Sequence, residues 1–274
     1  MSELYGLLGE KLSHSVSPQI HSMVFNKLNM KGYYHLFEFK SKDLKVVMEG
    51  FKVIKPKGIN VTIPYKIKVM EFLDEISTEA KKIGAVNTLK FEENKTIGYN
   101  TDYFGIGMLF NKYNIEVKNK KATILGNGGV AVTMAAYLLN SGIAEITVVT
   151  RDISKLKGNS KFGDCKLISY DELQGIKKSD IVVNCTPLGM YPNLGSSPIE
   201  KRYIGNFKTA VDMIYNPKKT LFLKYAEEKG LKAVNGLYML VGQAIAAQEI
   251  WNDIKIPKII IDEIYDELEK GVEN

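Results

Sequence analysis

A glycine-rich turn near the middle of the chain has the spacing of a dinucleotide-binding site. The apolar run 122–125 is followed by Gly126, Gly128 and Ala131, which match the G-x-G-x-x-(G/A) pattern of a strand–turn–helix unit. The first glycine permits a tight turn, the second lets the backbone approach a pyrophosphate, and Ala131 keeps the helix close to the strand. Backbone N–H groups at the helix start would then face the phosphates. The turn therefore predicts a nucleotide site, with an incidental glycine turn as the alternative.

The residues after the next apolar run, 145–150, indicate which dinucleotide binds. An acidic residue at the end of this strand would accept a hydrogen bond from the ribose 2′-OH of NAD, whereas an arginine would accommodate the 2′-phosphate of NADP. Here Thr150 is followed by Arg151 and Asp152, and Lys155 is a second cation nearby. We therefore expect NADP as the cofactor, and we retain NAD as the alternative because of Asp152.

Two hydroxyl groups precede the first predicted helix. Residues 4–8 form a predicted strand, and Ser17-Pro18 signals a helix start with Ser17 as the N-cap. Ser15 and Ser17 thus lie between a strand and a helix N-terminus, where hydroxyls and backbone donors could bind a carboxylate. Taken alone, the simpler interpretation is a loop serine followed by a capping serine.

A lysine and an aspartate follow two other predicted strands. Residues 59–63 alternate apolar and polar, which predicts a strand with Asn60 and Thr62 on one face. Lys66 comes after this strand, within a helix predicted over 65–73, at the end of the strand where ligands bind in open α/β sheets. Asp102 precedes an apolar helical pattern. The simplest roles for these two residues are a surface lysine and a helix N-cap.

The elements that would position these groups form two patterns. In the second half of the chain, strands alternate with helices, which indicates a parallel sheet. Its predicted strands are 122–125, 145–150, 180–185 and 209–214, and its predicted helices are 129–140, 154–157 and 221–229. The first half of the chain adds predicted strands at 34–39, 83–91 and 96–100, of which the last two form a hairpin. Two further helices are predicted near the C-terminus, at 237–251 and 257–268. Gln243 lies beside the apolar stripe of the helix at 237–251 and needs a hydrogen-bonding partner.

Seven short motifs, in this order, resemble those of the shikimate dehydrogenase family from end to end of the chain. They are His14–Pro18, Asn60–Lys66, Gly84–Thr88, Asn100–Asp102, Gly126–Gly129, Asp212–Tyr215 and Asn235–Ala244. The resemblance implies reversible, NADP-linked reduction of 3-dehydroshikimate to shikimate, in aromatic amino acid biosynthesis. It also implies a two-domain α/β fold: a substrate-binding domain built from both chain ends, 1–102 plus 237–274, around an inserted Rossmann domain, 103–236.

The resemblance assigns roles to the polar residues singled out above. Lys66 and Asp102 would be the catalytic pair, because an ammonium can stabilise and then protonate the oxygen that hydride addition leaves negative. Ser15 and Ser17 would bind the substrate carboxylate. The residues expected to hold the ring hydroxyls or to position the catalytic pair are Asn60, Thr62, Asn87 and Gln243, with Tyr215 reaching in from the cofactor domain. The expected cofactor-binding residues are Gly126, Asn127, Gly128, Gly129, Val130, Ala131, Thr150, Arg151, Lys155, Thr186, Met213 and Gly236.

Two departures from the family pattern keep alternatives open. The family commonly has Asn-Arg-Thr where this chain has Thr150-Arg151-Asp152, and Tyr103 replaces a glycine often found after the catalytic aspartate. The family also includes NAD-linked quinate/shikimate dehydrogenases, which is the second hypothesis. A non-catalytic nucleotide-binding regulator on the same scaffold is the third, disfavoured because Lys66 and Asp102 are both present.

Composition argues against several other classes. The chain has 274 residues, 45% hydrophobic and 25% charged, as in ordinary soluble proteins. Its net charge of +6 is scattered, which would attract an anionic substrate but lacks the dense basic stripe that nucleic acid requires. Two cysteines give no disulfide framework, three histidines lack metal-site spacing, and no apolar stretch reaches membrane-spanning length. We expect a soluble, cytoplasmic protein with a small-molecule substrate, no metal, and no nucleic-acid or membrane partner, with a homodimer retained as one assembly state.

Overall fold

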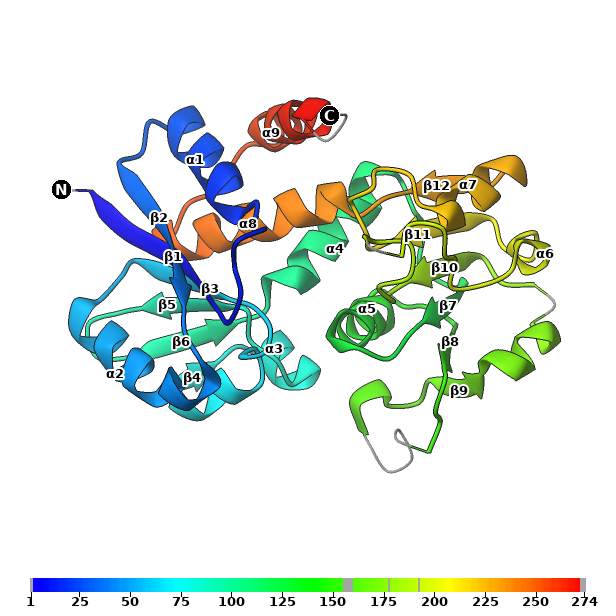
Figure 1. Cartoon of the computed structure of the whole chain (residues 1–274), viewed down its shortest axis with the longest axis horizontal. Helices are drawn as coiled ribbons and strands as arrows, with labels where there is room; N and C mark the ends of the chain where they lie inside the picture. Colours follow the sequence, from blue (N-terminus) through cyan, green and yellow to red (C-terminus); the bar gives the residue numbers. More distant parts are fainter. Residues whose placement is uncertain (1, 155–159, 177, 192, 272–274) are drawn as a thin grey trace. The chain divides into compact units, whose positions relative to one another are not determined.

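The computed structural model describes residues 2–154, 160–176, 178–191 and 193–271, which form two compact units (Figure 1). The first unit comprises Met1–Gly105 and Val241–Glu267, and the second comprises Ile106–Leu240 together with the segment from Leu268 onward. The divisions therefore fall within helices α4 (Thr101–Lys112), α8 (Leu237–Asn252) and α9 (Lys258–Gly271). The first unit thus combines an N-terminal segment with a segment from the last part of the chain.

The second unit contains a parallel sheet, with the strand order β12-β11-β10-β7-β8-β9 among the described residues. Its strands are β7 (Lys121–Leu125), β8 (Glu145–Thr150), β9 (Lys166–Ser169), β10 (Ile181–Asn184), β11 (Thr209–Asp212) and β12 (Lys232–Val234). This is the doubly wound order 6-5-4-1-2-3, in which a dinucleotide binds where the order reverses, between β7 and β10. The helical segments are α5 (Gly129–Asn140), η3 (Ser160–Phe162), η4 (Tyr170–Gly175), α6 (Lys201–Ile204) and α7 (Leu221–Glu228).

The parallel sheet and helices predicted for this part of the chain are confirmed, and α5 and β8 have the predicted bounds. Strands β9 and β12 were not predicted, because each is short and half-exposed and so lacks a continuous apolar run. The helix predicted near 154–157 falls largely outside the described residues. Leu125, Val149, Val182 and Phe222 form part of the core, in which the alternating elements bury their apolar faces.

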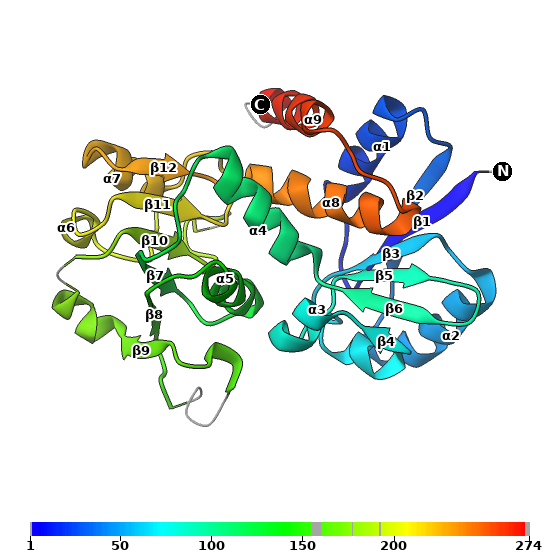
Figure 2. The ribbon, with the colours of Figure 1, turned by 180° about the vertical axis from the view of Figure 1, so that it is seen from behind.

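The first unit contains a mixed sheet with the order β2-β1-β3-β5-β6-β4 among the described residues, seen from both sides in Figures 1 and 2. The strands are β1 (Glu3–Gly9), β2 (Gly32–Glu38), β3 (Gly58–Val61), β4 (Glu75–Ile76), β5 (Thr88–Phe91) and β6 (Thr96–Tyr99). β1 is parallel to β2 and β3, whereas β5 is antiparallel to both β3 and β6. The helical segments are α1 (Ser17–Lys27), η1 (Ser41–Asp43), α2 (Leu44–Ile54), η2 (Lys68–Phe72) and α3 (Thr78–Ile83), with parts of α4, α8 and α9.

Three local predictions in this unit were wrong. Helix α1 begins at Ser17 itself, and the Ser15 hydroxyl accepts a hydrogen bond from the Ser17 N–H at 3.3 Å, so Ser17 is not the N-cap. The helix predicted over 65–73 is a 3₁₀ turn, Lys68–Phe72, and Lys66 lies in the loop before it. The strand predicted from residue 83 starts at Thr88, because α3 continues to Ile83 and ends at Gly84 in the left-handed conformation.

No helix in the part of the chain that the structure describes is long and apolar enough to cross a membrane.

Candidate active site

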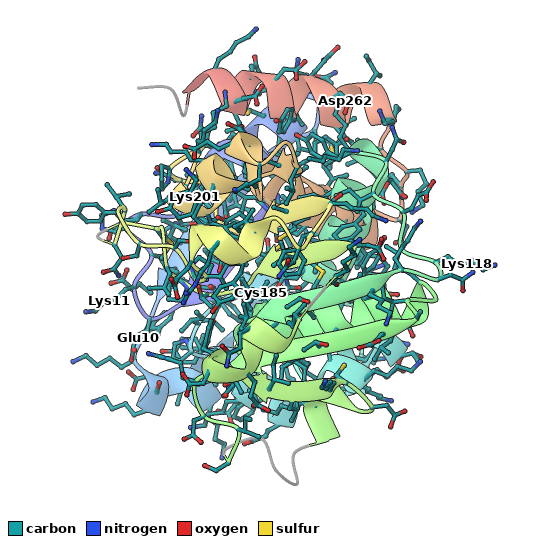
Figure 3. All side chains as sticks on the ribbon, turned by 90° about the vertical axis from the view of Figure 1, so that its right-hand side faces the viewer. Glu10, Lys11, Lys118, Cys185, Lys201 and Asp262 are labelled. Atoms are coloured by element: carbon teal, nitrogen blue, oxygen red, sulfur yellow. The ribbon has the colours of Figure 1, made fainter. Side chains whose placement is uncertain are left out.

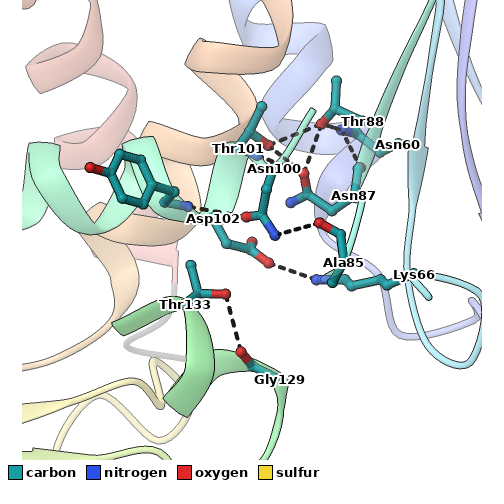
Figure 4. Close-up of polar contacts among 11 residues, drawn as sticks. Asn60, Lys66, Ala85, Asn87, Thr88, Asn100, Thr101, Asp102, Gly129 and Thr133 are labelled. Atoms are coloured by element: carbon teal, nitrogen blue, oxygen red, sulfur yellow. Dashed lines mark hydrogen bonds and ion pairs between the residues drawn. The ribbon is translucent and has the colours of Figure 1, made fainter. Parts of the chain in front are cut away.

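Lys66 and Asp102 form an ion pair in the first unit (Figure 4). Lys66 Nζ donates a hydrogen bond to Asp102 Oδ2 at 2.7 Å. The two side chains are 28% and 13% exposed, so the pair is largely sheltered yet open to a ligand. The sheet topology brings them together. Because β3 and β6 are both antiparallel to β5, they run in the same direction, and the residues that follow them emerge at one edge of the sheet.

Asp102 is available to Lys66 because a neighbouring residue caps helix α4. Asn100, just before the helix, accepts the Tyr103 N–H at 3.3 Å and donates from Nδ2 to the Ala85 carbonyl at 3.0 Å. The prediction that Asp102 could be the N-cap is therefore wrong, since Asp102 is the second residue of the helix. Its carboxylate still lies in the first turn, where the helix dipole favours a negative charge.

Asn87 presents a hydrogen-bond donor in a fixed direction. Its Oδ1 accepts the Thr101 N–H at 2.7 Å, and the Thr101 and Thr88 hydroxyls, each at 3.1 Å (Figure 4). A backbone N–H can only donate, so the orientation of the amide is determined. No described residue accepts a hydrogen bond from Asn87 Nδ2, which leaves that group for a ligand.

The Asn60 side chain forms hydrogen bonds with other groups of the protein. It is 5% exposed, and its Nδ2 donates to the Asn87 carbonyl at 3.3 Å and to Thr88 Oγ1 at 3.0 Å. Its Oδ1 accepts the Tyr34 hydroxyl at 2.7 Å. Of the two roles predicted for Asn60, these contacts match the positioning role, since both ends of the amide already bond to protein.

Tyr34 is a residue of this site that the sequence analysis missed. Burial raises its pKa well above the ordinary value of 10, and polar contact with the Ser17 side chain lowers it. The phenol is therefore protonated, and its hydroxyl bonds Asn60 Oδ1. The signal in the sequence was a tyrosine at the start of the strand predicted over 34–39. Nothing in that strand indicated that the tyrosine hydroxyl would have a polar partner.

The other predicted substrate residues divide between the two units. Ser15 and Ser17 are half-buried after β1, and Thr62 is half-buried after β3, with its N–H bonded to the Leu8 carbonyl at 2.9 Å. Since β1 and β3 are parallel neighbours, these three residues lie at one edge of the sheet. Gln243 is half-buried on α8 in the first unit. Tyr215 follows β11 in the second unit, where burial raises its pKa.

The glycine turn in the second unit has the geometry of a phosphate-binding loop. Gly126 has φ 102°, and a Cβ there would lie 2.9 Å from Thr186 Cγ2, so only glycine fits. Gly128 precedes α5 with no side-chain cap, and a Cβ on Gly128 or Gly129 would meet nothing within 4 Å. The start of α5 thus has no capping side chain and leaves room beside its first glycines, as binding of a dinucleotide requires. Ala131 is fully buried against the sheet, Asn127 is exposed and Val130 is half-buried.

The residues after β8 include an exposed arginine and an aspartate that accepts a hydrogen bond within its own turn. Thr150 ends the strand and is buried, and Arg151 is exposed directly after it. Asp152 Oδ1 accepts the Ser154 N–H at 3.0 Å, which uses one of its oxygens within its own turn. Lys155, predicted as a second cation, lies outside the described residues. Arg151 is therefore the charged side chain that this strand end leaves exposed.

The remaining predicted cofactor residues lie together at the carboxyl ends of three adjacent strands. The Thr186 hydroxyl donates to Asn184 Oδ1 at 2.7 Å, and the Met213 N–H donates to the Asn184 carbonyl at 3.0 Å. A Cβ on Gly236 would lie 2.4 Å from the Met213 carbonyl oxygen, so this approach also requires glycine. Asn184 thus connects the loops that follow β10 and β11.

A buried carboxylate supports Asn184. Asp212 is fully buried, and it accepts hydrogen bonds from Asn184 Nδ2 at 2.9 Å, the Ile214 N–H at 3.1 Å and the Thr220 hydroxyl at 2.5 Å. Burial raises the pKa of Asp212 to about 6, and the hydrogen bonds oppose that shift. The nearby Cys185 (Figure 3) is free, as is Cys165, and burial raises the pKa of both thiols, that of Cys165 to about 11. Neither thiol is therefore suited to nucleophilic chemistry.

Comparison with known proteins identifies the family. The family model described as shikimate dehydrogenase substrate binding domain matches residues 7–89, and the one described as shikimate / quinate 5-dehydrogenase matches residues 109–191. A shikimate dehydrogenase (NADP(+)) of Clostridium beijerinckii is 48% identical over 265 residues, covering 96% of this chain and 97% of the relative. The chain belongs to the shikimate dehydrogenase family.

Solved structures of the shikimate dehydrogenase family have the same fold. A chorismate mutase/shikimate 5-dehydrogenase fusion protein from Clostridium acetobutylicum is 51% identical, with a TM-score of 0.97 over 100% of both chains. A shikimate 5-dehydrogenase from Listeria monocytogenes, in complex with shikimate and NAD, is 31% identical, with a TM-score of 0.89 over 97% of this chain and 96% of that one. The two-domain α/β fold class predicted from the motifs is confirmed.

Proposed function

We propose that this chain catalyses the reversible reduction of 3-dehydroshikimate to shikimate with NADPH, in the shikimate pathway of aromatic amino acid biosynthesis. The observation that carries the proposal is the 2.7 Å contact between Lys66 Nζ and Asp102 Oδ2. This pair lies at the sheet edge near which Asn87 offers a free donor. Membership of the family and the open glycine turn support NADP as the partner of the reaction.

The chemistry assigned to the chain is proton transfer and charge stabilisation. When bound, NADPH supplies the hydride that adds to the ring C3 carbonyl carbon. As the carbonyl electron pair moves onto oxygen, the Lys66 ammonium stabilises the developing charge and gives the oxygen a proton from Nζ. Asp102 holds Lys66 in place through their hydrogen bond. In the reverse direction the neutral Lys66 amine takes the hydroxyl proton, and solvent restores the resting state.

Binding roles follow from the donors and acceptors that the site offers. Ser15 and Ser17 would bind the substrate carboxylate, and Asn87 Nδ2 would donate to a ring hydroxyl. Thr62 and Gln243 would complete the ring contacts, with Tyr215 contributed by the second unit. Residues Gly126 to Ala131 would hold the pyrophosphate of NADP, and Arg151 the 2′-phosphate. Thr150, Thr186, Met213 and Gly236 would complete the cofactor site.

An NAD-linked quinate/shikimate dehydrogenase is the second candidate. It is favoured by Asp152, one residue beyond Arg151, and by the relative crystallised with shikimate and NAD. The first candidate is favoured because Arg151 is exposed whereas Asp152 already accepts a hydrogen bond from its own turn. The third, a non-catalytic regulator, would have no use for the Lys66–Asp102 pair.

Steady-state assays with purified protein separate the three candidates. Shikimate or quinate is oxidised with NADP or NAD, in the four combinations, and kcat/KM is compared. The proposal predicts the highest value for shikimate with NADP. Quinate with NAD at an equal or higher value would overturn it in favour of the second candidate, and no turnover in any combination would favour the regulator.

The same proposal extends to domain limits, compartment and assembly. We place the substrate domain at 1–102 plus 237–274 and the cofactor domain at 103–236. A cytoplasmic location is consistent with two free thiols in a reducing compartment. A homodimer is the assembly state retained from the sequence, and sedimentation equilibrium would distinguish it from a monomer.

A further inference from the structure

A chain of hydrogen bonds joins Tyr34 to the donor that Asn87 presents. The Tyr34 hydroxyl bonds Asn60 Oδ1 at 2.7 Å, Asn60 Nδ2 donates to Thr88 Oγ1 at 3.0 Å, and Thr88 Oγ1 donates to Asn87 Oδ1 at 3.1 Å. The last three residues of this chain are drawn in Figure 4. This series of hydrogen bonds joins β2 and β3 to the start of β5, and each of its bonds is at least partly buried.

The direction of the bonds at both ends of this series is determined, and between them the Thr88 hydroxyl leads to Asn87 Oδ1 either directly or through the Thr101 hydroxyl, 3.0 Å away. Asn60 Nδ2 also donates to the Asn87 carbonyl, which is only an acceptor, so Asn60 Oδ1 must accept and Tyr34 must donate. At the other end, the Thr101 N–H fixes Asn87 Oδ1 as an acceptor. The chain therefore runs one way, from the Tyr34 phenol to the free Asn87 Nδ2, and bonds aligned in this manner polarise and strengthen one another.

The Tyr34 ring is held by a buried histidine. His21 on α1 stacks on it with ring centroids 4.1 Å apart and planes 10° apart. His21 is fully buried, and burial lowers its pKa to about 3, so the ring is neutral. Its Nδ1 lies 2.8 Å from Gln248 Nε2, whose own Oε1 accepts a hydrogen bond from Asn252. Gln248 can only donate through Nε2, so Nδ1 is the acceptor and the tautomer is set.

We propose that Tyr34, held by His21, is a positioning residue that aligns Asn60 and Asn87 and thereby sets the affinity for shikimate. The inference rests on the proposed function, because Asn87 is one of its expected substrate contacts. The phenol fixes Asn60, and Asn60 donates both to the Asn87 carbonyl and to the Thr88 hydroxyl that bonds the Asn87 side chain, so the phenol acts on the donor that Asn87 presents. Removing the phenol oxygen leaves Asn60 Oδ1 without its donor and loosens the hold of Asn60 on Asn87.

The test is Tyr34→Phe, which keeps the ring and removes only the hydroxyl. Shikimate and NADP dissociation constants are measured separately by calorimetry on the full chain. The proposal predicts about a tenfold weaker shikimate affinity, as for one lost hydrogen bond, with NADP affinity unchanged. Tyr33→Phe is the matched control, since Tyr33 is the preceding residue of the same strand, is 71% exposed, and loses the same atom. It should match the unmodified protein for both ligands.

A double-mutant cycle separates positioning from general packing. If Tyr34 acts through Asn87, the effects of Asn87→Ala and Tyr34→Phe on shikimate affinity are not additive in the double variant. Shikimate affinity within twofold of the unmodified protein, equal weakening of shikimate and NADP, or strict additivity would each overturn the inference. Should Tyr34→Phe fail to fold, Asn60→Asp breaks the next link with little change of shape and must show the same separation between the two ligands. Failure of the unmodified protein to bind shikimate would refute the proposed function instead.

Discussion

Protonation of the buried His21 should make the protein unstable in mild acid. His21 is fully buried, and its pKa falls from 6.5 to about 3 on folding. The native state therefore binds fewer protons than the unfolded chain below about pH 6.5, and the free energy of unfolding decreases as pH falls from there toward 3. At 1.36 kcal/mol per pH unit, His21 alone should cost about 3 kcal/mol between roughly pH 7.5 and pH 4.5.

Urea unfolding of the protein and of a His21→Gln variant, at both pH values, isolates this contribution. Other groups titrate in the same range: the raised pKa of Asp212, about 6, has the opposite sign, because the native state gains that proton first. Subtracting the pH dependence of the variant from that of the unmodified protein removes these shared contributions. Between the two pH values, the free energy of unfolding of His21→Gln should decrease by about 3 kcal/mol less than that of the unmodified protein. The exposed His35 provides the control, and His35→Gln should retain the original pH dependence. Equal acid losses in the protein and in His21→Gln would refute the assignment of a buried neutral imidazole.

Two further substitutions test the cofactor site. Arg151→Ala should weaken NADP by about 1–3 kcal/mol through loss of a charge-assisted contact and leave NAD nearly unchanged, as measured by titration with each cofactor; the same loss for both would show that Arg151 does not contact the 2′-phosphate. Gly126→Ala should lower the free energy of unfolding by about 1–3 kcal/mol, because its φ of 102° and the 2.9 Å approach to Thr186 exclude a side chain. Gly205→Ala, at a helix end with nothing within 4 Å of its Cβ position, is the control, and equal stability of the two variants would contradict the strain at Gly126.

Features encoded by neighbouring residues could be predicted from the sequence. The turn from β7 into α5 depends on glycines and small residues within one short segment, and α5 has the predicted bounds. The β5–β6 hairpin likewise depends on a local turn. In contrast, the contact between Lys66 and Asp102 depends on β3 pairing with β5, a long-range register that alternation along one strand does not determine. Only the family resemblance indicated that these two residues act together.

Tyr34 was missed for the same reason. Its bond to Asn60 crosses β1, because Tyr34 pairs with Tyr5, which pairs with Gly58, two residues before Asn60. Such a contact exists only once three strands are in register. Asp102 was interpreted as a helix cap because the spacing allowed it, and the structure shows that Asn100 takes that role. In both cases the sequence identified the polar residue or its element, and tertiary pairing decided its partner.

The central claim is that the Lys66 amine transfers the proton in a reaction in which NADP carries the hydride. The most direct measurement is single-turnover oxidation of shikimate by Lys66→Ala, followed by NADPH absorbance, beside the matched variant Lys68→Ala, which removes an exposed lysine two residues away. We predict a rate about 10²–10⁴-fold lower for Lys66→Ala, with unchanged NADP affinity, and an unaltered rate for Lys68→Ala. A Lys66→Ala variant that retains most of its rate would contradict the account.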